Sequence, residues 1–277
     1  RLAGAGLALV KGNGTGYTPA DIITSFTSSA TADETVRGLL IGQVYTLVET
    51  SAPAGYVLKT TGVSFQLNNA GMVVTATGSV TDTSAVSLVS MTNTPSGVTF
   101  SKRATGAGTA ELAGATLTIS HVEGGATVVD DTWVSGDSHN RDSANQPIAH
   151  VVNGKLKADG ATEYTFTEVG APAGYTIAGS IVFRIAVDGT VQIKQPDGSF
   201  TNAAGGAVVM TDAPIRFRVA KVDSASGAYL AGAEFRVAAD AAGKPASTSV
   251  TGFERIVSGS APVTVSGLPA GNYWLVE

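Results

Sequence analysis

The stretch YTLVETSAPAGY, Tyr45 to Tyr56, returns as YTFTEVGAPAGY, Tyr164 to Tyr175, and a third time as YWLVE, Tyr273 to Glu277. Alternate side chains of a β-strand share a face. In each copy the tyrosine, the next apolar residue on that face and a glutamate therefore point the same way; the glutamates are Glu49, Glu168 and Glu277. Burying a carboxylate without a partner is costly. The sequence therefore predicts a polar partner for each glutamate, and the same kind of partner in each copy.

The composition is typical of short strands joined by tight turns. Of the 277 residues, 43% are hydrophobic, 14% are charged and 34 are glycine, which together with abundant Thr and Ser predicts an all-β chain. The net charge of −5 argues against a nucleic-acid partner, because nucleic acids require a basic face. There is no cysteine, so a disulfide framework and a thiolate metal site are excluded.

Apolar runs are too short to span a bilayer, so no membrane span is expected in these residues. The chain begins at Arg1 without an initiator methionine, and we expect it to be a portion of a longer protein.

A second phrase, LAGA, also recurs three times, at residues 2–5, 112–115 and 230–233. Its periods of 110 and 118 residues are too long for solenoid repeats and predict tandem, self-contained domains. We place these units at residues 1–95, 96–213 and 214–277, with an insertion near 129–151 in the middle unit. The links between units are short and contain proline, which predicts a semi-rigid rod.

Lysines precede the second and third LAGA phrases. Alternation in VTFSK (98–102) and IRFRVAK (215–221) places Lys102 and Lys221 on the apolar faces of opening strands. The first two units end in strands that aim Asn93 and Asp212 inward, each 44 residues after its glutamate. We therefore expect the first unit to lack its lysine strand, the third to lack its last strand, and the middle unit to be complete.

A buried lysine beside an Asn or Asp and a glutamate suggests a covalent reaction. Burial disfavours the charged forms of amines and carboxyls, which can leave a neutral, nucleophilic amine next to a protonated acid. The glutamate can polarise the acceptor carbonyl and transfer protons while the amine attacks. The product is an amide between side chains, formed once, with loss of ammonia from Asn or water from Asp.

The opening lysine, the LAGA phrase, the Y-x-L/F-x-E-x-x-A-P-x-G-Y box and the terminal Asn/Asp strand together resemble the Cna-B (SpaA-type pilin) domain. That family forms stalks and shafts of Gram-positive surface adhesins and pili, so the resemblance implies an extracellular, cell-surface location. It also implies tandem immunoglobulin-like or prealbumin-like β-sandwich domains forming a rod. Further copies of the domain, in a longer chain or a filament, are the implied partners.

The family's intramolecular isopeptide bond implies a role for each matching residue. Lys102 would bond to Asp212 with Glu168 as the catalyst. Asn93 would be the acceptor beside Glu49 in the first unit, and Lys221 the donor beside Glu277 in the third. Asp212 departs from the more common Asn, and an Asp acceptor requires a protonated carboxyl. No cofactor is implied.

Other interpretations stay open at this stage. Lys102, Glu168 and Asp212 could form a buried ionic cluster without a covalent bond. The middle-unit insertion could instead bind a host surface ligand through an exposed aromatic or apolar patch, which would make the chain a ligand-binding adhesin module. A secreted hydrolase would need a convergent acid–base pair, and adjacent strand residues such as Asp130 and Asp131 should face opposite ways.

We predict no metal site. The histidines and acidic residues of the middle unit lack the spacing of metal-binding motifs, and a solvated insertion loop explains them better. They are His121, His139, His150, Asp130, Asp131, Asp137 and Asp142. Trp133 is predicted to be a core aromatic.

Overall fold

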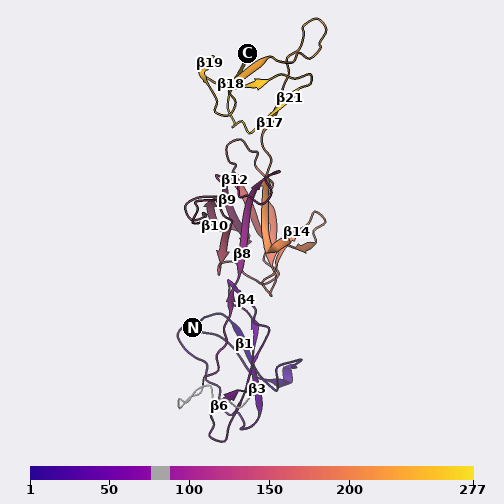
Figure 1. Cartoon of the computed structure of the whole chain (residues 1–277). Coiled ribbons are helices and arrows are strands. Elements are labelled where there is room, and N and C mark those ends of the chain that lie inside the picture. Colours follow the sequence, from indigo (N-terminus) through magenta and orange to yellow (C-terminus); the bar gives the residue numbers. More distant parts are fainter. Residues whose placement is uncertain (76–87) are drawn as a thin grey trace.

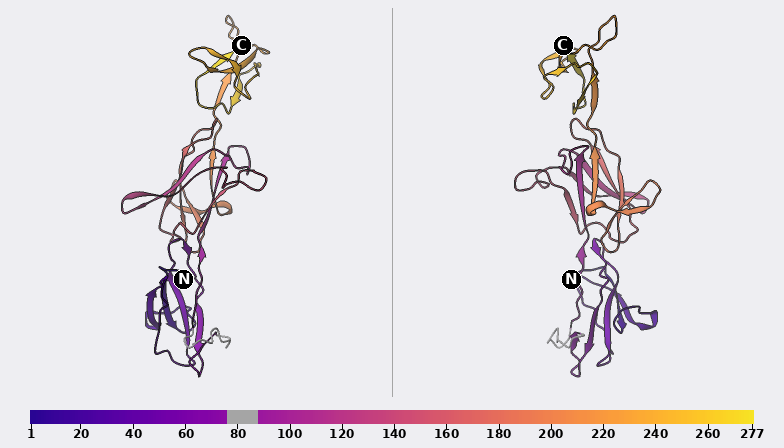
Figure 2. Two further views of the ribbon diagram at one scale, coloured as in Figure 1. Left: turned by 90° about the vertical axis from the view of Figure 1, so that its left-hand side faces the viewer. Right: turned by 45° about the vertical axis from the view of Figure 1, so that its right-hand side comes forward.

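The computed structural model describes residues 1–75 and 88–277 and stacks them as three β-rich bodies along one axis (Figure 1). Views from other sides show the same elongated shape (Figure 2). Each sheet is built within residues 6–95, 97–212 or 216–276, and the only helical turns among the described residues are η1 (Pro19–Asp21) and η2 (Ala204–Gly206). The predicted all-β fold class is confirmed.

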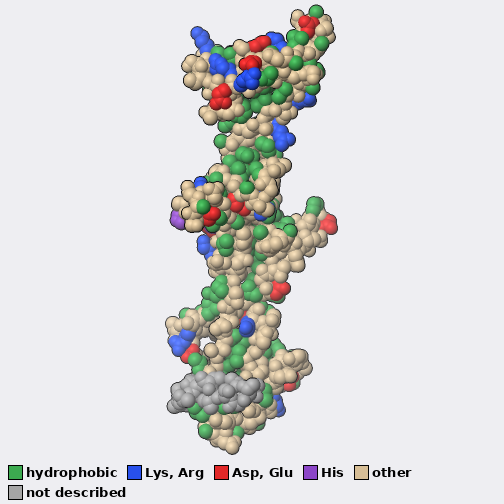
Figure 3. Space-filling view, viewed as in Figure 1, with side chains coloured by type: hydrophobic (Ala, Val, Ile, Leu, Met, Phe, Trp, Pro, Cys, Tyr) green, Lys and Arg blue, Asp and Glu red, His purple; other side chains and the backbone are tan. Residues whose placement is uncertain are grey.

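No helix in the described ranges is long and apolar enough to cross a membrane. On the side drawn in Figure 3, acidic and basic side chains are mixed over the described surface.

The middle unit is a sandwich of two sheets, with strand orders β10-β9-β12-β13-β14-β15 and β11-β8-β16. Its strands are β8 (Gly97–Ala104), β9 (Thr116–Glu123), β10 (Ala126–Val134), β11 (His150–Asn153), β12 (Tyr164–Gly170), β13 (Ile181–Ile185), β14 (Val191–Lys194), β15 (Phe200–Asn202) and β16 (Ala207–Asp212). Alternation in β12 buries Tyr164, Phe166 and Glu168 on one face, as predicted.

Aromatic rings from both sheets fill the middle of this sandwich. The ring of Phe100 lies 5.1–5.7 Å from the rings of Phe166, Phe183 and Trp133. Trp133 is 7% exposed, in line with its predicted place in the core. Because Lys102 and Glu168 each follow one of these rings by two residues, the same strands direct them into the same apolar interior.

The first and last strands of the middle unit lie side by side. β16 runs parallel to β8, with Met210 opposite Lys102 and Asp212 opposite Ala104. This pairing joins segments about a hundred residues apart in the sequence, and it brings the predicted donor and acceptor strands together.

The first unit has the sheet β2-β1-β3-β5-β6 and a small ladder, β4-β7. Its strands are β1 (Gly6–Lys11), β2 (Ile22–Thr27), β3 (Val44–Ser51), β4 (Tyr56–Val57), β5 (Val63–Leu67), β6 (Val73–Thr75) and β7 (Thr94–Pro95). The predicted last strand through Val89, Met91 and Asn93 is not regular: residues 88–93 form no ladder, although Val89 packs against the core. In the middle unit the equivalent strand pairs with the lysine strand, and the described part of the first unit offers no such partner.

The third unit consists of the pair β17-β21 and a sheet in which β19, β20 and β22 pair with β18. Its strands are β17 (Arg216–Val219), β18 (Glu234–Asp240), β19 (Pro245–Ser249), β20 (Ile256–Val257), β21 (Val263–Ser266) and β22 (Tyr273–Val276). Leu275 was expected to face a core, but it is 45% exposed, whereas its counterpart Phe166 is fully buried. Among the described residues, no last strand like β16 covers this side of the third unit.

The insertion is more ordered than the predicted solvated loop. β10 and β11 take up its two ends, and a bulge between Val129 and Asp131 interrupts the alternation, so the argument from adjacent strand residues fails there. Asp130 Oδ2 is hydrogen-bonded to His121 Nδ1 at 2.8 Å, and Asp131 Oδ2 to His150 Nε2 at 3.1 Å. All four side chains are largely buried.

Replacing Phe100 by alanine tests the aromatic core. Phe100→Ala should lower the free energy of unfolding of the middle unit by about 3–5 kcal/mol, because it removes a ring that contacts three others. Val151→Ala on β11, where the side chain is 51% exposed, should change it by less than about 0.5 kcal/mol. Urea unfolding followed by tryptophan fluorescence measures both, and equal losses would contradict the assigned core.

Candidate isopeptide site

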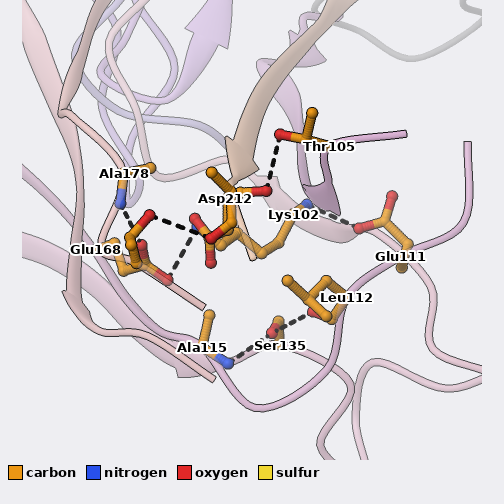
Figure 4. Close-up of polar contacts among 11 residues, drawn as sticks. Lys102, Thr105, Glu111, Leu112, Ala115, Ser135, Glu168, Ala178 and Asp212 are labelled. Atoms are coloured by element: carbon orange, nitrogen blue, oxygen red, sulfur yellow. Dashed lines mark hydrogen bonds and ion pairs between the residues drawn. The ribbon is translucent and has the colours of Figure 1, made fainter. Parts of the chain in front are cut away.

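Three ionisable side chains meet at one end of the aromatic core of the middle unit. Lys102 comes from β8, Glu168 from β12 and Asp212 from the end of β16 (Figure 4). The side chains of Lys102, Glu168 and Asp212 are 1%, 0% and 0% exposed. The strands of both sheets thus deliver the amine and two carboxyls into a site closed to solvent.

The lysine amine contacts both acids. Lys102 Nζ lies 2.9 Å from Glu168 Oε1, and it donates a hydrogen bond to Asp212 Oδ1. The other oxygen of Asp212, Oδ2, is buried and has no hydrogen-bond partner among the described residues. The amine is therefore in contact with a carboxyl group that is only partly satisfied.

Asp212 is shifted towards its protonated form. Burial raises the pKa of its carboxyl above the usual value, and the nearby Glu168 acts in the same direction. The hydrogen bond from Lys102 and its positive charge lower the pKa of Asp212, but by less than burial and Glu168 raise it. A protonated Asp212 is the form that an amine can convert to an amide with loss of water.

Backbone groups hold the two acids in place. Glu168 Oε2 accepts a hydrogen bond from the Ala178 backbone N–H at 2.7 Å. The backbone carbonyl of Asp212 accepts two hydrogen bonds from Thr105, one from its backbone N–H at 2.8 Å and one from its hydroxyl at 3.0 Å. Neither acid depends on the lysine alone for its position.

The lysine strand is held by residues that the sequence analysis did not identify. Glu111 accepts the Lys102 backbone N–H at 2.8 Å and also the Ser101 hydroxyl, and the Leu112 N–H donates to the Lys102 carbonyl at 2.7 Å. The Ser135 hydroxyl in turn donates to the Leu112 carbonyl at 2.6 Å.

In each unit the backbone N–H of the last alanine of LAGA donates a hydrogen bond to a serine hydroxyl. The pairs are Ala5 with Ser28, Ala115 with Ser135 and Ala233 with Ser258. The signal in the sequence was a serine 20 to 25 residues after each phrase, which is too variable to recognise without the structure.

The first unit brings its predicted acceptor and catalyst together. Asn93 Nδ2 lies 2.8 Å from both carboxylate oxygens of Glu49, and Glu49 Oε2 accepts the Lys59 backbone N–H at 2.6 Å. Glu49 is 8% exposed. The described residues place no lysine amine in contact with this pair.

The third unit pairs its predicted donor with its glutamate. Lys221 Nζ forms an ion pair with Glu277, and the two side chains are 36% and 51% exposed. Lys221 lies two residues beyond the end of β17, and the Leu230 N–H donates to its carbonyl as Leu112 does to Lys102. The predicted inward burial of this pair is not observed.

The other acidic and histidine residues do not assemble a further centre. Among the described residues, no group of three or more His, Cys, Asp or Glu side chains is arranged to hold a metal ion. His121 and His150 are each engaged by one aspartate, and His150 stacks on Trp133 with a centroid distance of 4.1 Å. These contacts join strands of the sandwich.

The family model of the SpaA prealbumin-like fold domain matches residues 1–81 and 96–198, about two thirds of the chain. The chain belongs to the SpaA prealbumin-like domain family. The site of Lys102, Glu168 and Asp212 therefore lies in a SpaA-type domain, although Asp212 itself is beyond the matched residues.

Solved structures similar to this chain include the Bacillus anthracis TIE protein, with 20% identity and a TM-score of 0.38 over 99% of this chain and 42% of that one. A C-terminal fragment of the pilus adhesin SpaC from Lactobacillus rhamnosus GG shows 18% identity and a TM-score of 0.37, over 76% of this chain and 89% of the fragment. The major pilin subunit BcpA of Bacillus cereus shows 18% identity and a TM-score of 0.32, over 99% of this chain and 83% of that one.

The chain thus spans less than half the length of the TIE protein that it matches. No curated protein matches it.

Removing the lysine should expose the raised pKa of Asp212 as a pH-dependent stability. In Lys102→Ala the bond and charge that oppose the shift are lost, so the folded state should bind a proton more tightly than the unfolded chain does. A raised folded-state pKa stabilises at low pH, and this contribution is lost as pH rises through the folded value. The free energy of unfolding should therefore fall as pH rises above about 4, the ordinary pKa range of an aspartate carboxyl. The double variant Lys102→Ala/Asp212→Asn should show a smaller slope, and equal slopes would contradict the assignment.

Proposed function

We propose that this chain is a structural stalk or shaft segment of a bacterial cell-surface adhesin or pilus, stiffened by isopeptide bonds that its own units form. The main observation behind this proposal is the buried contact of Lys102 with Glu168 and Asp212, which links the first and last strands of the middle unit. Membership of the SpaA prealbumin-like family supports it. The proposed units span residues 1–95, 96–213 and 214–277.

The proposed reaction condenses the Lys102 amine with the Asp212 carboxyl. The neutral amine attacks the carbonyl carbon of protonated Asp212, Glu168 takes a proton from the attacking nitrogen, and the acceptor hydroxyl leaves as water with that proton. One C–N bond forms and one C–O bond breaks, with no oxidant or cofactor. The reaction occurs once in each molecule, so Glu168 catalyses a self-modification and the chain is not an enzyme towards other substrates.

The outer units carry halves of the same site. In the first unit, Asn93 would be the acceptor and Glu49 the catalyst, and an Asn acceptor would release ammonia instead of water. In the third unit, Lys221 would be the donor and Glu277 the catalyst. Their contacts, Asn93 with Glu49 and Lys221 with Glu277, support these roles. Further units of the same kind, in a longer chain or a filament, are the proposed partners.

The position of the proposed bond explains its mechanical value. The middle unit is entered through β8 and left through β16, and these strands carry Lys102 and Asp212. A bond between the two side chains would carry a pulling force from one strand to the other without unfolding the residues between them. It would also keep the unfolded chain looped, which opposes heat denaturation.

Ligand binding by the insertion is the alternative function, and no contact in the described structure favours it. The aromatic residue of that region, Trp133, stacks between His150 and Phe166 and is 7% exposed. Asp137 and Asp142 accept backbone N–H groups within their own loop. The insertion is therefore best explained as part of the sandwich.

The bond is tested by the intact mass of the whole chain under denaturing conditions. The expected mass is lower than the sequence mass by one water, and the deficit should disappear in Lys102→Ala and Glu168→Ala. Lys155→Ala, whose side chain is 58% exposed, is the matched control and should keep the deficit. A full unmodified mass for the unaltered chain would refute the cross-link, and a deficit that survives in Glu168→Ala would refute the role of Glu168.

The mechanical role is tested by pulling single molecules from both ends of the chain. Lys102 and Asp212 are 110 residues apart, so the bond should prevent roughly 360–400 Å of chain from extending under force. Glu168→Ala should recover this length as an additional unfolding step at the middle unit. Lys155→Ala should not, and recovery in the unaltered chain would contradict the stalk mechanism.

A further inference from the structure

The boundary between the first and middle units is bridged by two backbone hydrogen bonds among three residues. The Ser96 N–H donates to the Gly55 carbonyl at 2.8 Å, and the Gly154 N–H donates to the Ser96 carbonyl at 2.8 Å. Gly55 belongs to the APAGY loop (residues 52–56) of the first unit, and Gly154 directly follows β11 of the middle unit. One linking residue thus bonds to a glycine on each side of the boundary.

The boundary between the middle and third units has the same construction. The Ile215 N–H donates to the Gly174 carbonyl at 2.8 Å, and the Gly267 N–H donates to the Ile215 carbonyl at 2.8 Å. Gly174 occupies the same place in its APAGY loop (residues 171–175) as Gly55 does, and Gly267 directly follows β21. The linking residues Ser96 and Ile215 differ chemically, so only backbone groups are common to the two junctions.

The approach at both junctions is too close for a side chain on the loop glycine. A Cβ on Gly55 would lie 2.2 Å from the Gly154 carbonyl oxygen, and a Cβ on Gly174 would lie 2.4 Å from that of Gly267. Both obstacles are backbone atoms, which cannot turn aside as a flexible side chain can. Both loop glycines also have positive φ, +82° and +87°.

The tripeptide that contains the receiving glycine recurs in the first unit. Gly154 stands in VNG and Gly267 in VSG, and Gly38 of the first unit stands in VRG. Gly38 is exposed and has a φ of +79°, close to the +67° of Gly154 and the +85° of Gly267. The local backbone conformation of the receiving glycine is therefore common to all three units.

We propose that the glycine after β11, and its counterpart after β21, is a docking surface whose partner is the APAGY loop of the preceding unit. Backbone-to-backbone contact fixes the orientation between units, and the glycine of the loop is the residue that permits it. This function of the box is separate from holding the catalytic glutamate, and it does not require an isopeptide bond.

Distance distributions between spin labels in the whole chain test the proposal. The sequence has no cysteine, so labels attach only at introduced sites. Thr127→Cys with Ser247→Cys spans the second junction, and Ser25→Cys with Thr127→Cys spans the first; all three positions are exposed. Both pairs should give narrow distributions, and a broad one in the unaltered chain would overturn the proposal.

Gly174→Ala should widen the distribution across the second junction by a factor of roughly two or more and leave the first unchanged, because domain motion is the default without a close interface. Gly106→Ala is the matched control: its φ of +85° imposes the same backbone strain, but a Cβ there meets no atom within 4 Å. Equal widening in both variants, or none in Gly174→Ala, would overturn the proposal.

Ser96→Ala tests whether the backbone groups are sufficient. The Ser96 hydroxyl donates to the Gly55 carbonyl at 3.1 Å and to the Leu156 carbonyl at 2.6 Å, so it also joins the two sides of the first junction. Because Ser96→Ala keeps both backbone hydrogen bonds of residue 96, the distribution across the first junction should stay narrow. Widening there would show that the hydroxyl, and not the backbone, sets the orientation, and would overturn the proposal.

Discussion

The middle unit depends on one unfavourable placement, an amine and two carboxyls buried together at the end of an aromatic core. Each would lose several kcal/mol of solvation if it stayed charged, and mutual attraction recovers this only with good geometry. The raised pKa of Asp212 is one response, because it lowers the charge of the cluster. The proposed amide would be a more complete response, since it would replace a donor amine and an acid by a neutral group and release water. The cost of burial would therefore favour the proposed reaction.

Comparison of the units shows what positions the glutamate of the box. Glu49 and Glu168 each accept a backbone N–H from the residue ten positions later, Lys59 and Ala178, although only Glu168 contacts a lysine. The strand and the segment after the APAGY loop therefore hold the carboxylate whether or not a lysine contacts it. Asn93 donates a hydrogen bond to Glu49 even though residues 88–93 pair with no neighbouring strand. The glutamate can thus organise the acceptor, and the lysine strand supplies the ladder that makes the last strand regular.

Strand alternation was sufficient to predict the inward faces of β8, β12 and β16, because each of these strands has a paired neighbour and packs its apolar face against the core. Lys102, Glu168 and Asp212 all lie where the two-residue period places them. The same reasoning was wrong for Leu275 and for the strand through Asn93, since period alone does not say whether a neighbouring strand is present. It also failed at Asp130, where a bulge shifts the register. Glu111 and Ser135 could not be predicted, because their partners are backbone groups brought close only by the fold.

The two phrases that reveal the repeat also lie close together. A Cβ on the LAGA glycine, Gly114, would lie 3.7 Å from Cβ of the box proline Pro172, and Gly4 stands in the same relation to Pro53 at 3.9 Å. LAGA thus connects the backbone of the lysine strand to the box, and the box extends from Glu168 inside the unit to Gly174 at its boundary. Gly174, which touches the next unit, follows Glu168, the proposed catalyst of the cross-link, by six positions. One short segment therefore carries both the residue proposed to catalyse the cross-link and the residue that meets the next unit, so the same sequence box serves the interior of the unit and its boundary.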